Sequence, residues 1–266
     1  MANENLVLSE AGVEKLTKTE RPVPGLYDDP SGYCTFGIGH LVHKWNCFLL
    51  EAASTGDPWS KYLLEQRPGS NGLYLERSAA SDPDFAKLKT RAVEIAESAV
   101  TQKWYKKRFD KLTGQEQAKV TAAATKAVED QASLLGKTPD EVLKEDLKQF
   151  EKAVRADIKV ELTERQFDAL VSLCFNIGPS AFSRSKVVAE INKNRYRSGS
   201  VQQRQDGIRA VENAFLEFNK SDGRVNAGLM RRRYAEADDF LGEARTELKE
   251  LEKNVRIASG SPAVKI

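Results

Sequence analysis

The sequence has few of the residues on which metal centres and disulfide frameworks depend. Its 266 residues include three cysteines and two histidines. The odd number and wide spacing of Cys34, Cys47 and Cys174 do not suggest a disulfide framework, so we expect reduced thiols. The chain also lacks an apolar run of about 18 residues, so no transmembrane helix is predicted.

A strong charge of either sign is absent as well. The chain carries 41 basic and 39 acidic residues, for a net charge of +2. This balance does not suggest a nucleic-acid-binding protein, although it is compatible with an anionic polymer as substrate. The start of the sequence has no basic segment followed by an apolar one, so we expect no signal peptide. An apolar fraction of 40% is enough for a substantial core, and 30% charged residues with ordinary glycine and proline usage predict a soluble globular protein.

Most of the sequence has the spacing of amphipathic helices. Three segments begin with a capping-box pattern, at Thr113, Thr138 and Thr163. The third runs on to Gly178, which together with the following proline predicts the helix end. A further run begins near Asp82, whereas residues 57–82 are rich in glycine, proline, serine and aspartate and are predicted to form a loop.

Three more helical patterns follow, over residues 184–196, 207–219 and 228–254. The last carries apolar residues at alternating steps of four and three, as in a heptad repeat. We interpret it as a terminal helix packed on its own chain, which favours a monomer. A coiled-coil dimer through this helix is the alternative.

Residues 26–41, LYDDPSGYCTFGIGHL, predict a β-hairpin with a tight Asp-Pro-Ser-Gly turn. The preceding helix must end near Glu20, because proline at position 22 disfavours helix at the residue before it. Gly37 and Gly39 do not form a dinucleotide-binding motif, because Val42 stands where its third glycine is needed. The gaps between Cys34, His40, His43 and Cys47 do not match the usual zinc motifs, so we expect no metal.

Acidic residues at a helix end and on a hairpin fit the cleavage of a glycosidic bond, although acids in such places are usually only solvated. One carboxyl group must donate a proton to the leaving oxygen, while another orients water or stabilises positive charge across the sugar ring. Glu20 and Asp29 fit these two positions. Asp28 should face the other way on an extended chain, and we expect it to be solvated.

The spacing of Glu20, Asp29 and Thr35, followed by Phe-Gly-Ile-Gly-His, closely resembles the catalytic signature of phage-type lysozymes, the endolysins of glycoside hydrolase family 24. The resemblance covers roughly residues 8–45 and 138–242. It includes LTERQFDALVSLCFNIG and the segment DGRVNAGLMRRRYAEADDF.

This resemblance implies an α+β, mostly helical lysozyme-like fold, with a cleft between a small hairpin lobe and a helical C-terminal lobe. We expect four parts: the N-terminal helix and catalytic hairpin (1–45), a mostly helical insert (46–137), the connecting helix and C-terminal lobe (138–242), and a charged helical tail (243–266).

The resemblance also implies a muramidase that cleaves the β-1,4 bond between N-acetylmuramic acid and N-acetylglucosamine in peptidoglycan, with inversion and without a cofactor. Glu20 is then the general acid, while Asp29 and Thr35 hold the attacking water. The resemblance further implies roles in substrate binding and in structure. The predicted glycan contacts are Leu41, Phe175 and Asn176, and the predicted structural pair linking the lobes is His40 with Asp146.

The chain departs from the family pattern in two places. Arg21 and Pro22 stand where family members commonly have glycine after the catalytic glutamate, and the compact phage enzymes lack residues 46–137. We expect an endolysin made in the host cytoplasm that reaches the cell wall after holin release. The alternatives are a lytic transglycosylase, a secreted antibacterial effector, a virion-associated lysozyme, and a non-catalytic domain that binds cell wall or a protein partner.

Overall fold

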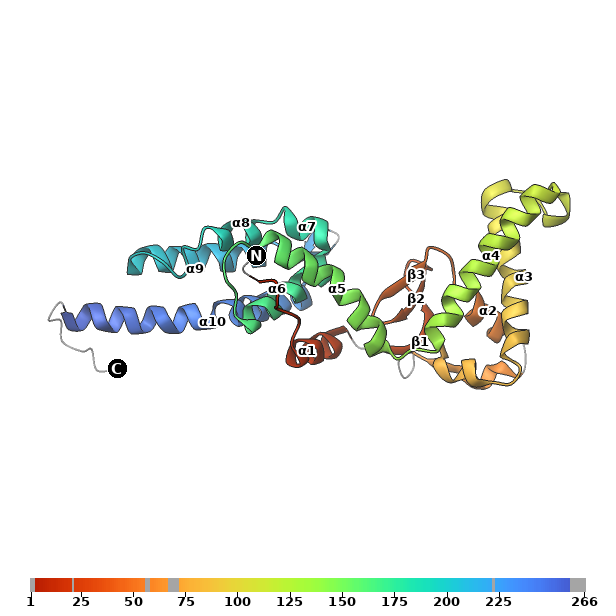
Figure 1. Ribbon diagram of the computed structural model, residues 1–266, viewed down its shortest axis with the longest axis horizontal. Coiled ribbons are helices and arrows are strands. Elements are labelled where there is room, and N and C mark those ends of the chain that lie inside the picture. Colours follow the sequence, from red (N-terminus) through yellow and green to blue (C-terminus); the bar gives the residue numbers. More distant parts are fainter. Residues whose placement is uncertain (1–2, 21, 56–57, 67–71, 222, 259–266) are drawn as a thin grey trace. The chain divides into compact units, whose positions relative to one another are not determined.

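The computed structural model describes residues 3–20, 22–55, 58–66, 72–221 and 223–258. The chain forms two compact units, which we call the terminal unit (Met1–Leu16 with Leu147–Ile266) and the central unit (Thr17–Asp146). Most described residues are helical and a small antiparallel sheet lies in the central unit, so the predicted α+β, mostly helical class is confirmed (Figure 1).

The central unit is built on a five-stranded antiparallel sheet with strand order β3-β2-β1-β5-β4. The predicted hairpin is present as β1 (Val23–Asp28) and β2 (Cys34–Gly37), and β3 (His40–His43) continues it. The helix before it, α1 (Glu10–Glu20), ends where expected. Pro22 cannot donate a helical hydrogen bond, which accounts for this end.

The prediction of a loop over residues 57–82 was wrong. This segment holds η1 (Trp59–Tyr62), β4 (Leu63–Glu65), β5 (Leu73–Glu76) and η2 (Arg77–Ser81). β5 pairs with β1, placing Leu75 opposite Leu26, and both side chains are fully buried. Strands of three and four residues are too short to show a period in the sequence, and long-range pairing decides their conformation.

Helices complete the central unit. They are α2 (Phe48–Ser54), α3 (Phe85–Tyr105), the short η3 (Phe109–Lys111) and α4 (Gly114–Leu135). α4 begins with the predicted capping box, in which Thr113 and Glu116 satisfy each other's backbone N–H groups. α3 and α4 pack on each other and on α2 (Figure 1). Buried rings such as Phe36 and Phe48 each stabilise this core by about 2–3 kcal/mol relative to exposure.

The terminal unit is helical. It contains α6 (Glu164–Ile177), α7 (Pro179–Ser183), α8 (Lys186–Asn192), α9 (Val201–Leu216) and α10 (Ala227–Ala258), with a small hairpin of β6 (Lys220–Ser221) and β7 (Arg224–Val225). The capping box at Thr163 is confirmed. α6 ends before Gly178, whose φ of 83° favours glycine over any side chain.

Helix α10 packs against α6 and α9 of its own chain. Its heptad positions at Ala237, Leu241, Ala244 and Leu248 are buried there, which supports a terminal helix packed within the chain. α5 (Pro139–Asp157) begins in the central unit and ends in the terminal unit, and its predicted capping box at Thr138 is present. Within the described ranges, no helix is both long and apolar enough to cross a membrane.

Candidate active site

The register of the hairpin sorts its side chains onto two faces. Tyr27 lies opposite Thr35, and Asp28 lies opposite Cys34. Paired residues of an antiparallel ladder share a face, and successive residues alternate. Asp28 and Cys34 therefore point to the buried core side, where Leu26 and Phe36 also lie, while Tyr27, Asp29 and Thr35 share the other side.

Asp29 is fixed by the turn that it begins. Its Oδ1 accepts hydrogen bonds from the backbone N–H groups of Ser31 (2.7 Å) and Tyr33 (2.9 Å). The backbone closes the same turn, since Gly32 N–H donates to the Asp29 carbonyl at 2.8 Å and Gly32 adopts a φ of 74°. Among the described residues no donor lies on Oδ2, so this oxygen can accept a hydrogen bond from water.

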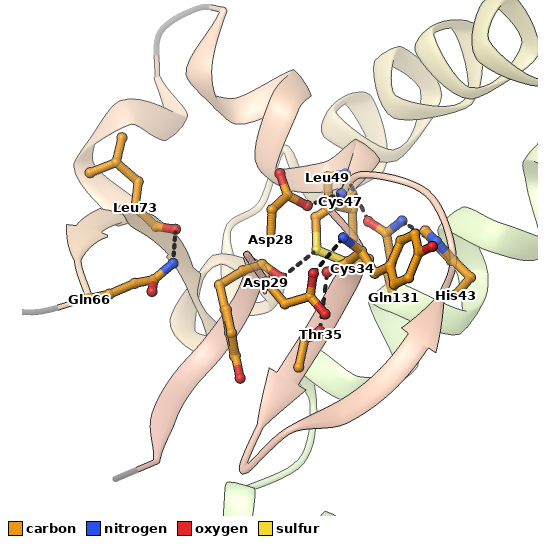
Figure 2. Close-up of a disulfide and its surroundings, with 12 residues drawn as sticks. Asp28, Asp29, Cys34, Thr35, His43, Cys47, Leu49, Gln66, Leu73 and Gln131 are labelled. Atoms are coloured by element: carbon orange, nitrogen blue, oxygen red, sulfur yellow. Dashed lines mark hydrogen bonds between the residues drawn. A yellow bond between two sulfur atoms is a disulfide. The ribbon is translucent and has the colours of Figure 1, made fainter. Parts of the chain in front are cut away.

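Thr35 lies close to Asp29 in the hairpin (Figure 2). Its side chain is almost fully buried, and its hydroxyl donates to the Tyr33 carbonyl oxygen at 3.1 Å. With its only proton committed to the backbone, the Thr35 hydroxyl acts toward a neighbour as an acceptor. Asp29 and Thr35 thus provide two hydrogen-bond acceptors in the same part of the hairpin.

Tyr27 lies within electrostatic range of both predicted catalytic carboxylates. Burial raises the pKa of its phenol, and the charges of Asp29 and Glu20 raise it further, while the Gly39 N–H that it accepts lowers it. Sequence reasoning did not select Tyr27. Its position two residues before Asp29 on a strand was the available signal, because that spacing puts both side chains on one face.

Glu20 is the last residue of α1 and is half-buried. The departure from the family pattern at Arg21 lies outside the described residues. Glu20 and the hairpin both belong to the central unit, and the charge of Glu20 contributes to the raised pKa of Tyr27. The role of Glu20 as general acid stays a prediction.

The expectation that Asp28 is solvated was wrong. Its Oδ1 accepts a hydrogen bond from the backbone N–H of Cys47 at 2.6 Å, just before α2. Burial raises the pKa of the Asp28 carboxyl, against the lowering effect of the Cys47 N–H, and the Asp29 charge adds to the increase. The alternation that turns Asp28 away from Asp29 turns it toward the core.

The expectation of reduced thiols was also wrong for two of the three cysteines. Cys34 and Cys47 form a disulfide (Figure 2), and Cys174 is free and buried. Burial raises the pKa of the Cys174 thiol to about 12. The reason is tertiary: the chain returns past β2 after β3, as the 2.6 Å hydrogen bond from Cys34 N–H to the Trp45 carbonyl shows.

The disulfide removes two of the four zinc ligands considered from the sequence, because neither Cys34 nor Cys47 has a thiolate that could bind a metal. His43 Nε2 instead accepts from the Gln131 amide at 2.7 Å. Burial lowers the pKa of His43, which favours this neutral, accepting form.

His40 and Asp146 are in contact, with His40 Nδ1 lying 2.8 Å from Asp146 Oδ2. Both residues belong to the central unit. The pair therefore joins β3 to the start of α5. The expectation that it links the two lobes was wrong. Leu41, the next residue, is 46% exposed.

The other predicted glycan contacts belong to the terminal unit. Phe175 packs edge-on against Phe150, with ring centroids 5.2 Å apart. Asn176 is exposed, and its Oδ1 accepts a hydrogen bond from Arg233 Nη2 at 2.9 Å. Sequence reasoning did not identify Arg233, which is completely buried.

Comparisons with known proteins support the family resemblance. Residues 111–236 match the family model "Phage lysozyme", so the resemblance to phage-type lysozymes is confirmed. The matched region does not include Glu20, Asp29 or Thr35. The chain is 33% identical to the endolysin of Bacillus phage B103 over 115 residues, which is 43% of this chain and 39% of that protein.

The endolysin of Salmonella phage P22 is 39% identical over 93 residues, or 35% of this chain and 56% of that protein. The chain thus spans well under two thirds of the length of these relatives. Among solved structures, the muramidase domain of SpmX from Asticaccaulis excentricus is 22% identical, with a TM-score of 0.44 over 89% of this chain and 99% of that chain. The endolysin of Escherichia coli O157:H7 phage FAHEc1 is 18% identical, with a TM-score of 0.46 over 90% and 96%.

Proposed function

We propose that this chain is a peptidoglycan hydrolase of the muramidase type. It cleaves the β-1,4 bond between N-acetylmuramic acid and N-acetylglucosamine. The observation that carries the proposal is the hairpin face on which Asp29 and Thr35 offer two acceptors beside a tyrosine that experiences the charges of both Asp29 and Glu20. The names of the endolysin relatives point to the same substrate class.

In this mechanism Glu20 donates its proton to the leaving glycosidic oxygen. Asp29, whose Oδ1 is held by the turn, accepts one hydrogen of the attacking water through Oδ2 and takes up its proton as attack proceeds. Thr35 accepts the other hydrogen and orients the lone pair toward the anomeric carbon. Direct attack by water inverts the anomeric configuration.

Clearing of purified peptidoglycan tests this assignment. Wild type should clear the suspension, whereas Glu20→Gln and Asp29→Asn should each lose about 10²–10⁴-fold in rate, the usual contribution of acid–base groups. Asp28→Asn is the matched control, because this adjacent acid binds the Cys47 backbone on the core face and should retain activity. No clearing by wild type would show that the chain is not a hydrolase, and equal clearing by Glu20→Gln would remove Glu20 from the mechanism.

The products distinguish hydrolysis from the transglycosylase reaction. Hydrolysis gives reducing N-acetylmuramic ends with the α configuration, whereas a lytic transglycosylase needs no water and gives 1,6-anhydro ends. In the proposed setting the chain acts as a phage endolysin that reaches the cell wall through a holin. Lysis of host cells on co-expression with a holin, and no lysis without it, would support that setting over secreted effector action.

A further inference from the structure

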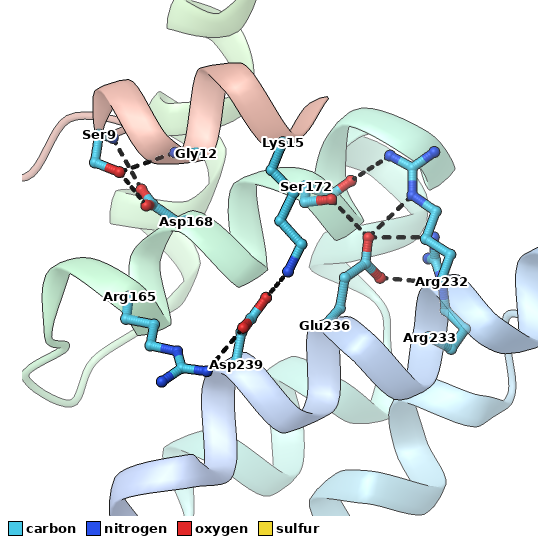
Figure 3. Close-up of polar contacts among 10 residues, drawn as sticks. All are labelled: Ser9, Gly12, Lys15, Arg165, Asp168, Ser172, Arg232, Arg233, Glu236 and Asp239. Carbon is cyan, nitrogen blue, oxygen red and sulfur yellow. Dashed lines mark hydrogen bonds and ion pairs between the residues drawn. The ribbon is translucent and has the colours of Figure 1, made fainter. Parts of the chain in front are cut away.

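The terminal unit contains a buried ion pair that the proposed mechanism does not use. The Arg233 side chain has no exposed surface and its Nε lies 3.0 Å from Glu236 Oε2, whose side chain is 3% exposed. Glu236 Oε1 also accepts from the Ser172 hydroxyl at 2.6 Å and from Arg232 Nε at 3.1 Å. Figure 3 shows the Glu236 carboxylate between Ser172 on α6 and both arginines on α10.

Stability alone does not explain such a pair. Removing two charges from water costs about as much as their attraction returns, so apolar residues of similar volume usually serve a core equally well. A buried pair is better explained if it fixes the orientation of a neighbouring side chain. Here the arginine reaches past its partner, and its Nη2 donates to Asn176 Oδ1 at 2.9 Å.

That contact fixes which way the Asn176 amide points. A guanidinium group has only donors, so the atom facing Arg233 must be the amide oxygen and cannot be the nitrogen. The Asn176 N–H₂ group is then directed away from Arg233. Asn176 is exposed, and no residue in the described ranges accepts a hydrogen bond from its amide nitrogen, so both donors can reach a ligand.

The neighbouring surface suits a sugar. Phe175, which precedes Asn176, and Phe150 are half-buried aromatic rings packed edge to face. Partly exposed rings beside a fixed planar amide combine an apolar contact with directional donors, as carbohydrate sites require. The carbonyl of an N-acetyl group is an acceptor that such an amide can recognise.

We propose that Arg233 and Glu236 are positioning residues that hold the Asn176 amide with its N–H₂ group toward the glycan, where it binds an N-acetyl carbonyl. This inference rests on the proposed function, because the glycan strand is taken to be its substrate. It assigns a role in substrate binding to two buried residues that do not contact the substrate themselves.

The test measures binding to purified peptidoglycan by co-sedimentation, with Glu20→Gln as the background so that the polymer is not consumed. Asn176→Asp is the sharpest variant, since an aspartate oxygen still accepts from Arg233 while the two donors are lost. We expect binding about 3- to 10-fold weaker, the value of one net hydrogen bond. The double variant Arg233→Met with Glu236→Gln should lose a similar factor, because the amide is then free to rotate.

Coupling between these changes separates positioning from a general structural role. Adding Asn176→Asp to the double variant should cause no further loss, since both act through one amide. In the active background, KM should rise by the same factor with kcat unchanged. Arg165→Met is the matched control, because Arg165 is an exposed arginine of the same unit that pairs with Asp239 at 3.0 Å, and it should bind as wild type.

Several results would overturn the inference: wild-type binding by Asn176→Asp, wild-type binding by the double variant, losses that add in the triple variant, or no binding of the parent chain to peptidoglycan. If the double variant does not fold, Arg233→Lys replaces it, because lysine keeps a charge near Glu236 but lacks the second planar N–H. A chain that binds peptidoglycan in the predicted pattern but never cleaves it would contradict the proposed hydrolase and leave this inference standing.

Discussion

Reduction of the Cys34–Cys47 disulfide is expected to lower the free energy of unfolding by about 3 kcal/mol. The two cysteines are 13 residues apart in sequence, and closing a loop of this size in the unfolded chain accounts for that value in the chain-entropy model. Both side chains are fully buried, so the reduced thiols still fill the core and little cavity cost is added. The melting temperature should fall by roughly 6–12 °C.

The assay is thermal unfolding of the wild-type chain with and without a phosphine reductant. Thiol counting in denaturant should give one free thiol before reduction, Cys174, and three afterwards. The variant Cys34→Ala/Cys47→Ala should melt low in both conditions and show no response to reductant. If thiol counting shows the wild type to be oxidised and reduction leaves its melting temperature unchanged, the disulfide does not stabilise the fold as expected.

Four further substitutions test separate parts of the molecule. Asp28→Asn should be more stable than wild type at neutral pH. The pKa of Asp28 is raised in the folded chain, so ionising this carboxyl lowers the free energy of unfolding once the pH exceeds its pKa in the unfolded chain. Urea unfolding should show the stability difference between variant and wild type shrinking toward pH 4, and a difference that stays constant with pH would contradict this. Tyr27→Phe should lower kcat about 3- to 10-fold through loss of the hydroxyl that accepts the Gly39 N–H, and unchanged steady-state kinetics would exclude a role for it. Gly37→Ala should destabilise by at least about 1–2 kcal/mol in chemical denaturation, since φ is 61° and an added Cβ would lie 3.3 Å from Pro139. Thr163→Ala should cost about 1 kcal/mol by the same method through loss of the α6 cap, and Thr163→Ser, which keeps the hydroxyl, should be nearly neutral.

Local patterns predicted much of the secondary structure. The capping boxes at Thr113, Thr138 and Thr163 place the start of three helices correctly, because a cap depends on residues three apart in sequence. The turn between β1 and β2 is equally local, since Asp29 binds the N–H groups of its own turn. The spacing of Glu20, Asp29 and Thr35, together with the motifs further along the chain, indicated the resemblance to phage-type lysozymes.

Interactions between distant residues could not be predicted in this way. β4 and β5 are strands because β5 pairs with β1, Cys34 meets Cys47 because the chain returns past β2 after β3, and Asp28 is held by the N–H of Cys47. Arg233 lies on α10 and Asn176 on α6, and their contact depends on the packing of those helices. Sequence patterns were enough to place the starts of three helices and the hairpin turn, since residues close in sequence specify them, and the resemblance to phage-type lysozymes supplied the candidate catalytic residues. The disulfide, the sheet partners and the contact of Arg233 with Asn176 depend on the tertiary fold, because each joins residues that sequence spacing does not relate.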